Sequence, residues 1–124
     1  ITGDGSIQMN IQELATAHRL RLPIMIALLD NGYLGMVRQW QELFFEKRYS
    51  HTKLDENPDF VKLIEAYGAR GVRVCKVEEV EPALKEAFAA KTLTLIDFIV
   101  ECEANVFPMV PAGEAIDRMI GGMA

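Results

Sequence analysis

The sequence has few cysteines, no excess of positive charge and no long apolar run, and each shortage excludes a class of protein. Cys75 and Cys102 lack the spacing of a metal or redox site, so we expect reduced thiols in the core. The formal net charge of −5 at pH 7 offers no electrostatic footprint for nucleic acid. No apolar stretch approaches the length of a membrane-spanning helix, and the first residues lack the pattern of a signal peptide. We therefore expect a cytoplasmic protein that binds neither nucleic acid nor membrane.

The chain does have the composition of one globular domain. It contains 124 residues, of which 50% are hydrophobic and 25% charged, and this is enough to bury a core. Residues 1–3 look like the end of a strand, although a useful strand needs about five residues. We therefore expect a piece of a longer protein, truncated at its amino end.

Apolar periodicity predicts strands that alternate with helices. The unbroken apolar run at 24–29 is typical of a strand covered on both faces, and an alternating run indicates a short strand at 72–77. The strongly apolar segment 93–100 is the last strand candidate. Asn10 is the expected N-cap of the first helix. The helices are expected at residues 10–22, 33–45, 58–68, 78–90 and 114–120. The pattern predicts an α/β domain with a mostly parallel sheet flanked by helices.

The helix expected at 33–45 has an unusually broad apolar surface. Two neighbouring lines of apolar side chains run along it: Leu34, Val37 and Phe44, and Met36, Trp40 and Leu43. Such a helix is either deeply buried or faces a partner or ligand. On these grounds alone, Trp40 is a core or interface aromatic and Met36 fills a gap in a core.

Two turns, each after a predicted strand, form the candidate site. Gly3-Asp4-Gly5-Ser6 follows the first strand, and Asp30-Asn31-Gly32-Tyr33 follows the second. In open α/β sheets, ligands bind beyond the carboxyl ends of the strands. Oxygens of Asp4 and Asn31 suit a hard cation such as Mg²⁺, and glycines allow backbone N–H groups to approach phosphate. The pair predicts a divalent metal and a diphosphate bound together, while each turn alone is also an ordinary turn.

Four segments extend this pattern across the chain. They are Gly3-Asp4-Gly5-Ser6, residues 10–16 (NIQELAT), residues 34–40 (LGMVRQW) and residues 107–113 (FPMVPAG). Together they resemble the catalytic (large) subunit of acetolactate synthase, also called acetohydroxyacid synthase, which is a thiamin diphosphate enzyme. The resemblance covers essentially all of residues 1–124 but only the C-terminal part of that longer family. It implies a partial thiamin-diphosphate- and Mg²⁺-binding domain with the pyrophosphate-binding fold of these enzymes.

The resemblance also implies a role for each site residue. The side chains of Asp4 and Asn31 and the main-chain carbonyl of Tyr33 would bind Mg²⁺. Backbone amides of Gly5 and Ser6 would hold the diphosphate. The full set of implied cofactor-binding residues is Gly3, Asp4, Gly5, Ser6, Asn31, Tyr33 and Met36.

A substrate channel is implied beside the cofactor. Met36 would lie near the thiazolium ring, Trp40 would line the access channel, and Ala112 would lie in a segment that folds over the entrance. Tyr33 stands where the family often has His, which a backbone ligand tolerates. Ala112 replaces a Ser seen in other members, a change that concerns herbicide contacts rather than catalysis.

The activity implied for the full-length enzyme is decarboxylation of pyruvate and transfer of the two-carbon unit to a second 2-keto acid, in branched-chain amino acid biosynthesis. The activating Glu of the family comes from another domain, so we expect no catalytic residue in this chain and no activity from it alone. A homodimer or tetramer is expected, and FAD would bind outside this chain. The resemblance leaves open the second keto acid and a regulatory small subunit.

Two alternatives remain. The first is a related thiamin diphosphate enzyme, such as glyoxylate carboligase, sulfoacetaldehyde acetyltransferase or a decarboxylase. The second is a non-catalytic α/β module that keeps the fold as an interaction domain. Retention of both Asp4 and Asn31 argues against the second, because a decayed site has little use for an acid among glycines.

Overall fold

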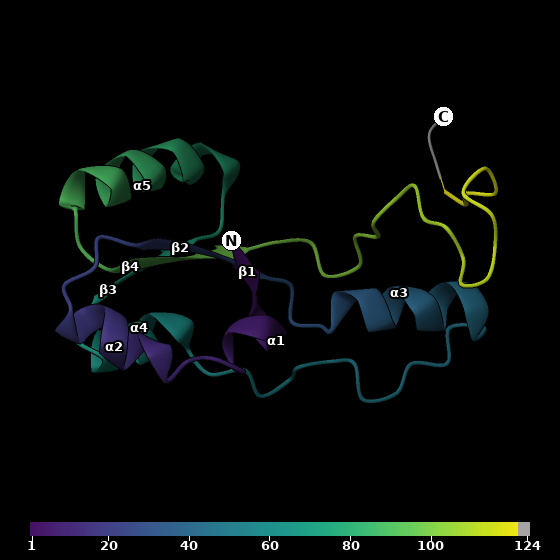
Figure 1. Cartoon of the computed structure of the whole chain (residues 1–124), viewed down its shortest axis with the longest axis horizontal. Coiled ribbons are helices and arrows are strands. Elements are labelled where there is room, and N and C mark those ends of the chain that lie inside the picture. Colours follow the sequence, from purple (N-terminus) through teal and green to yellow (C-terminus); the bar gives the residue numbers. More distant parts are fainter. Residues whose placement is uncertain (122–124) are drawn as a thin grey trace.

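A four-stranded parallel sheet lies at the centre of the computed structural model, which describes residues 1–121 (Figure 1). Its spatial order is β1-β2-β4-β3, and every neighbouring pair is parallel. The strands are β1 (Thr2–Gly3), β2 (Met25–Asp30), β3 (Arg70–Val74) and β4 (Thr94–Ile99). The structure therefore confirms the predicted α/β class.

The two central strands, β2 and β4, lie in the two most apolar strand candidates of the sequence. β2 and β4 pair over six residues, from Met25 opposite Thr94 to Asp30 opposite Ile99. Leu28, Leu95 and other side chains of these strands are fully buried because helices cover both faces of the sheet. Since all strands run the same way, their carboxyl ends meet at one edge of the sheet.

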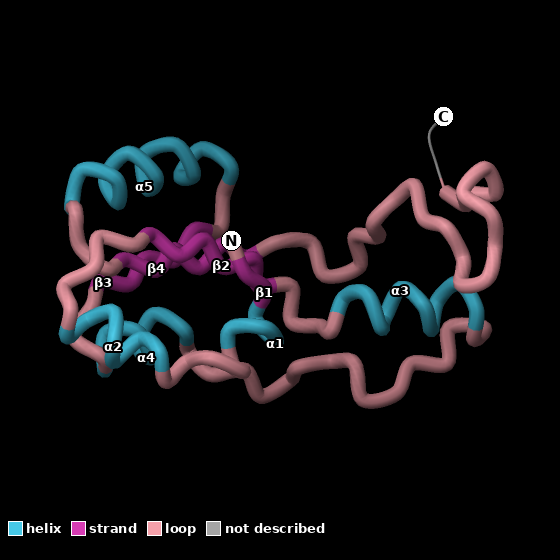
Figure 2. Tube along the Cα trace, viewed as in Figure 1, coloured by secondary structure: helices cyan, strands magenta, loops and turns pink. Residues whose placement is uncertain are grey.

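Helices cover both faces of this sheet (Figures 1 and 2). α5 (Val77–Ala90) packs on one face through Ala83 and Ala87, against Val74 and Ile96. The other face carries three shorter helices, α1 (Asp4–Ile7), α2 (Glu13–Arg19) and α4 (Phe60–Ala66). Their apolar side chains form the larger core, which includes Ile7, Leu14, Ala17, Phe60 and Ile64.

α4 packs closely against β3 at Gly71. A Cβ atom at this position would lie 2.9 Å from the carbonyl oxygen of Val61 and 2.8 Å from a methyl group of Ile64. A backbone atom cannot move aside cheaply, so a larger residue would push the helix away from the sheet. Gly71 therefore sets the spacing between α4 and β3.

α3 (Gly35–Phe44) stands apart from the sheet and lies between the loop that follows it and the C-terminal segment (Figure 2). Met36, Val37, Trp40 and Phe44 each expose 45–48% of their surface. The polar side chains on the same helix, Arg38 and Gln39, are instead buried. Among residues 1–121, no helix is long and apolar enough to cross a membrane.

Several local predictions were wrong. Asn10 does not cap the first long helix, which begins at Glu13 with Gln12 in the N-cap position and no side-chain cap. The glycine turn at 3–6 is instead the start of a short helix, because Asp4 to Ile7 already have helical hydrogen bonding. The third strand lies at 70–74, and Val77 belongs to α5.

The C-terminal part and the cysteines also differ from expectation. Residues 114–120 form turns rather than a helix, and Ile120 pairs with Met109 in an isolated antiparallel bridge. Cys75 is exposed and Cys102 is half-buried. Both thiols are free, but neither belongs to the core, so the predicted burial was wrong.

Candidate functional site

The two predicted turns meet in one pocket at the carboxyl edge of the sheet. This pocket has a volume of ≈ 470 Å³ and is lined by residues from both turns, from the first turn of α3 and from the segment after β4. All seven predicted cofactor-binding residues line it: Gly3, Asp4, Gly5, Ser6, Asn31, Tyr33 and Met36. The geometry thus brings the whole predicted set together, and what these residues bind stays a prediction.

Asp4 is the buried acid of this pocket. Only 2% of its surface is exposed. Its Oδ1 accepts a hydrogen bond from the Gly5 N–H (3.0 Å), and its Oδ2 accepts from the Gly32 N–H (3.0 Å) and from Asn57 Nδ2 (2.8 Å). Three donors thus hold the Asp4 carboxylate in one orientation.

The second turn is held by its own hydrogen bonds and by a neighbouring loop. Asn31 Oδ1 accepts a hydrogen bond from the Tyr33 N–H (3.1 Å). The Leu34 N–H donates to the carbonyl oxygen of Thr52, and the Leu54 N–H donates to that of Gly32, both at 2.8 Å. The turn is therefore braced before any ligand binds.

Gly5 is explained by packing in addition to any phosphate contact. A Cβ atom at Gly5 would lie 2.8 Å from Cδ2 of Leu34. At Gly3 the nearest atoms would be 4.0 Å away, which leaves room for a side chain. Leu34 therefore occupies the space beside Gly5. The sequence alone predicted only that this glycine lets the backbone approach phosphate.

Negative charge is crowded at this edge of the sheet. Burial raises the pKa of Asp30 to about 6, helped by the neighbouring carboxylates of Asp4 and Asp97, while the Gly32 N–H lowers it. Burial also raises the pKa of Asp97, although its hydrogen bond with Arg73 acts in the opposite direction. A bound cation would relieve this crowding.

The donor set fits Mg²⁺ better than a transition metal. Within residues 1–121, no group of three or more His, Cys, Asp or Glu side chains could hold a metal ion. The pocket instead offers a carboxylate, an amide and backbone carbonyls, and Mg²⁺ commonly binds through one or two carboxylates together with phosphate oxygens. These residues therefore fit a magnesium–diphosphate pair.

The predicted channel residues divide between two pockets. Met36 lines the pocket that contains Asp4. Trp40 and Ala112 line a separate apolar pocket of ≈ 310 Å³, together with Phe44, Phe45 and Pro111. α3 contributes residues to the lining of both pockets.

Sequence reasoning missed the polar residues that hold α3 against the C-terminal segment. Arg38 donates to the carbonyl of Glu103 (2.7 Å), to Asn105 Oδ1 and to Glu42 (3.1 Å). Gln39 exchanges two hydrogen bonds with the backbone of Val106, at 2.8 and 2.9 Å. The sequence gives no distinct signal for them, because the same helix also contains the polar residues Gln41 and Glu42.

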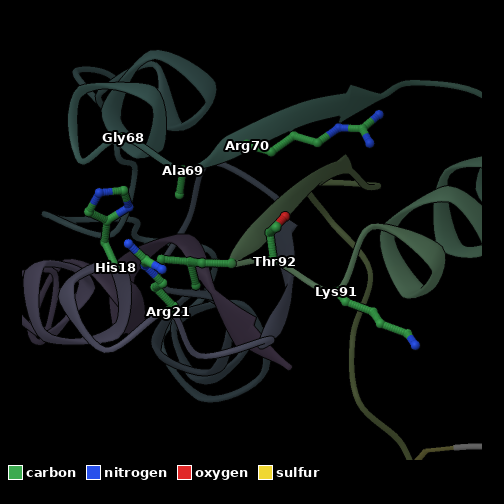
Figure 3. Close-up of a pocket in the computed structure, with 8 residues that line it drawn as sticks. His18, Arg21, Gly68, Ala69, Arg70, Lys91 and Thr92 are labelled. Carbon is green, nitrogen blue, oxygen red and sulfur yellow. The ribbon is translucent and has the colours of Figure 1, made fainter.

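A larger pocket of ≈ 540 Å³ lies among His18, Arg21, Gly68, Ala69, Arg70, Lys91, Thr92 and Leu93 (Figure 3). Its basic side chains do not converge, because Arg70 and Lys91 point away from His18 and Arg21. Arg70 is also paired with Glu86 at 2.6 Å. This arrangement offers no centre for an anion, and the candidate site remains the pocket around Asp4.

An open parallel sheet with a turn-built polar pocket beyond its strands defines an α/β cofactor-binding domain. Residues 1–98 match the family model described as "Thiamine pyrophosphate enzyme, C-terminal TPP binding domain". The chain belongs to this family.

Curated relatives and solved structures agree with this assignment. The acetolactate synthase large subunit of Corynebacterium glutamicum is 52% identical over 120 residues, which cover 93% of this chain and 19% of the relative. That of Haemophilus influenzae is 46% identical over 121 residues, covering 97% and 21%. The chain therefore spans about a fifth of the length of these relatives.

Among solved structures, a thiamine diphosphate-dependent 4-hydroxybenzoylformate decarboxylase from Rhodococcus jostii RHA1 superposes with a TM-score of 0.75 at 33% identity. The match covers 82% of this chain and 19% of that one. A benzoylformate decarboxylase from Polynucleobacter necessarius gives 0.77 at 26% identity, covering 85% and 20%.

Proposed function

We propose that this chain is the C-terminal thiamin-diphosphate- and Mg²⁺-binding domain of a larger acetolactate synthase. The observation that carries the proposal is the meeting of all seven predicted cofactor-binding residues in one pocket. The relatives named acetolactate synthase large subunits, at 46% and 52% identity, support the particular enzyme.

The residues of the pocket would divide the binding between them. Asp4, the side chain of Asn31 and the main-chain carbonyl of Tyr33 would hold Mg²⁺, which offsets the negative charge that Asp4 and Asp30 place at this edge. Backbone N–H groups of Gly5 and Ser6 would hold the diphosphate. Neither glycine of the first turn has a positive φ, so this binding does not depend on an unusual backbone conformation.

The apolar walls of α3 would guide the substrates. Met36 would face the reacting part of the cofactor, and Trp40 and Ala112 would line the path toward it. Thiamin diphosphate, when bound, acts as the electron sink for decarboxylation of a 2-keto acid. The chain's own part is to hold the cofactor, exclude water and shape the channel, while the activating Glu would come from another domain.

The assembled protein would act on pyruvate and a second 2-keto acid in branched-chain amino acid biosynthesis. We further propose a cytoplasmic homodimer or tetramer, in which exposed apolar residues of α3 contact another domain or subunit. The relatives are named large subunits, which favours a regulatory small subunit as a partner. FAD, where present, would bind outside this chain.

A related decarboxylase is the second candidate, because both solved neighbours carry that name. Assays of the full-length protein with pyruvate, glyoxylate and benzoylformate separate the candidates. We expect acetolactate from pyruvate with added thiamin diphosphate and Mg²⁺, and no product from the isolated chain. Benzaldehyde formation from benzoylformate without acetolactate formation would contradict the proposal.

A further inference from the structure

Asn57, in the loop between α3 and α4, contacts the carboxylate of Asp4. Its Nδ2 donates a 2.8 Å hydrogen bond to Asp4 Oδ2, although the two residues lie 53 positions apart. The other hydrogen bonds to this carboxylate come from the backbone N–H groups of Gly5 and Gly32. Because Asn57 donates through its side chain and lies outside both turns, a substitution at Asn57 can remove this hydrogen bond without changing the turns.

Both the oxygen and the nitrogen of the Asn57 side-chain amide form hydrogen bonds. Its Oδ1 accepts a hydrogen bond from Gln8 Nε2 (2.9 Å), and the same Gln8 nitrogen donates to the carbonyl oxygen of Asp4 (3.2 Å). Because Asn57 Oδ1 is taken by Gln8, and Asp4 Oδ2 also accepts from the Gly32 N–H, the NH₂ end of Asn57 faces Asp4. The network thus fixes Asn57 in one orientation, and Asn57 in turn fixes Asp4 Oδ2.

The loop that carries Asn57 runs along the second turn of the site. Tyr33 and Lys53 form an isolated antiparallel bridge, and the Leu54 N–H donates to the carbonyl of Gly32 (2.8 Å). The same loop therefore contacts both turns, the second through its backbone and the first through Asn57. Its placement and the orientation of the Asp4 carboxylate are linked.

We propose that Asn57 is a positioning residue for a divalent cation held by Asp4; this inference rests on the proposed function. Mg²⁺ demands near-ideal octahedral geometry, so a ligand held in one orientation binds it better than a ligand free to rotate. Hydrogen-bond partners of metal ligands commonly contribute 10- to 100-fold in metal affinity. A role in loop packing alone would change stability and leave the metal affinity of the folded protein unchanged.

The test measures metal binding directly in the full-length protein. Mn²⁺ replaces Mg²⁺, and free Mn²⁺ is followed by electron paramagnetic resonance at saturating thiamin diphosphate. We expect Asn57→Ala to weaken Mn²⁺ binding by about 10- to 100-fold. Gln8→Ala removes the partner of the Asn57 amide and a hydrogen bond to the Asp4 carbonyl but leaves all three donors to the Asp4 carboxylate, so it should cause a smaller loss. Asn10→Ala, an exposed asparagine near the same turn, is the matched control and should bind like wild type.

The outcomes separate the two proposals. Folded Asn57→Ala that binds Mn²⁺ within twofold of wild type would overturn the positioning role while leaving the proposed function standing. If Asn57→Ala does not fold, Gln8→Ala decides, because Gln8 is exposed and its loss leaves the core intact. An unchanged affinity in Gln8→Ala would then overturn the inference. Failure of the wild-type protein to bind Mn²⁺ with thiamin diphosphate would overturn the proposed function itself, and this inference with it.

Discussion

The carboxylate of Asp4 accepts a 3.0 Å hydrogen bond from the backbone N–H of Gly32, which lies 28 residues further along the chain. This contact joins the first turn of the candidate site to the second. It arises because β1 and β2 are adjacent parallel strands, so both turns leave the same edge of the sheet. This topology supports the proposed cation site between the two turns.

Gly5→Ala should lower the free energy of unfolding by about 1 kcal/mol, the low end for overpacking, because a methyl group of Leu34 would have to move. Urea unfolding of the chain measures the loss. In a Leu34→Ala background the cost should fall to near zero, since the obstructing atoms are gone. Gly3→Ala is the matched control, with its nearest atoms at 4.0 Å, and should be tolerated. An equal cost at both glycines would contradict the packing account.

Arg38→Met should loosen the C-terminal segment from α3. The substitution keeps an apolar stem but removes the donors to Glu103, Asn105 and Glu42. We expect limited proteolysis between residues 103 and 110 to become roughly tenfold faster, since hydrogen bonds to a charged group are among the stronger ones. Arg118→Met, which removes a surface pair with Glu114, is the control and should change little. Equal cleavage rates in the two variants would show that Arg38 does not hold this segment.

Asp97 should make stability depend on pH. Burial raises the pKa of this carboxyl above its ordinary value of 3.8 despite the 3.0 Å ion pair with Arg73. The folded state therefore binds more protons than the unfolded state between 3.8 and the raised pKa, so stability falls as pH rises through that window. Asp97→Asn cannot titrate and lacks this component.

Thermal unfolding at pH 4, 5, 6 and 7 checks this sign. The melting temperature of Asp97→Asn minus that of wild type should become more positive as the pH rises. A difference that stays constant, or that becomes more negative, would mean that the pairing with Arg73 outweighs burial.

The sheet was predictable where one physical cause dominates. β2 is an apolar run without alternation up to Asp30, and β4 is strongly apolar apart from Thr94 and Asp97; burial on both faces favours such segments. The ends of elements were less predictable. Asn10 had the chemistry of an N-cap, but the chain makes single turns before Glu13. The N–H groups of Glu13 and Leu14 donate to backbone carbonyls of these turns, so no side-chain cap is needed. The turns at 114–120 were missed because a short helical pattern there has no core to pack against.

The sequence predicted the site residues that lie next to a predicted strand, but not those that come from distant parts of the chain. Asp4 and Asn31 could be found because each follows a predicted strand. Their convergence further requires that β1 and β2 be neighbours, which the structure shows. Asn57 carries no local signal, since an Asn before a proline is an ordinary loop residue. Its contact with Asp4 spans 53 positions and appears only in three dimensions.

The central claim is that Asp4 and Asn31 hold one metal ion together with a diphosphate. Isothermal titration calorimetry of thiamin diphosphate into the full-length protein, with Mg²⁺ and with EDTA, tests it most directly. The account predicts saturable binding that requires Mg²⁺ and that is lost in both Asp4→Ala and Asn31→Ala. Binding that persists in EDTA, or that survives both substitutions, would contradict it.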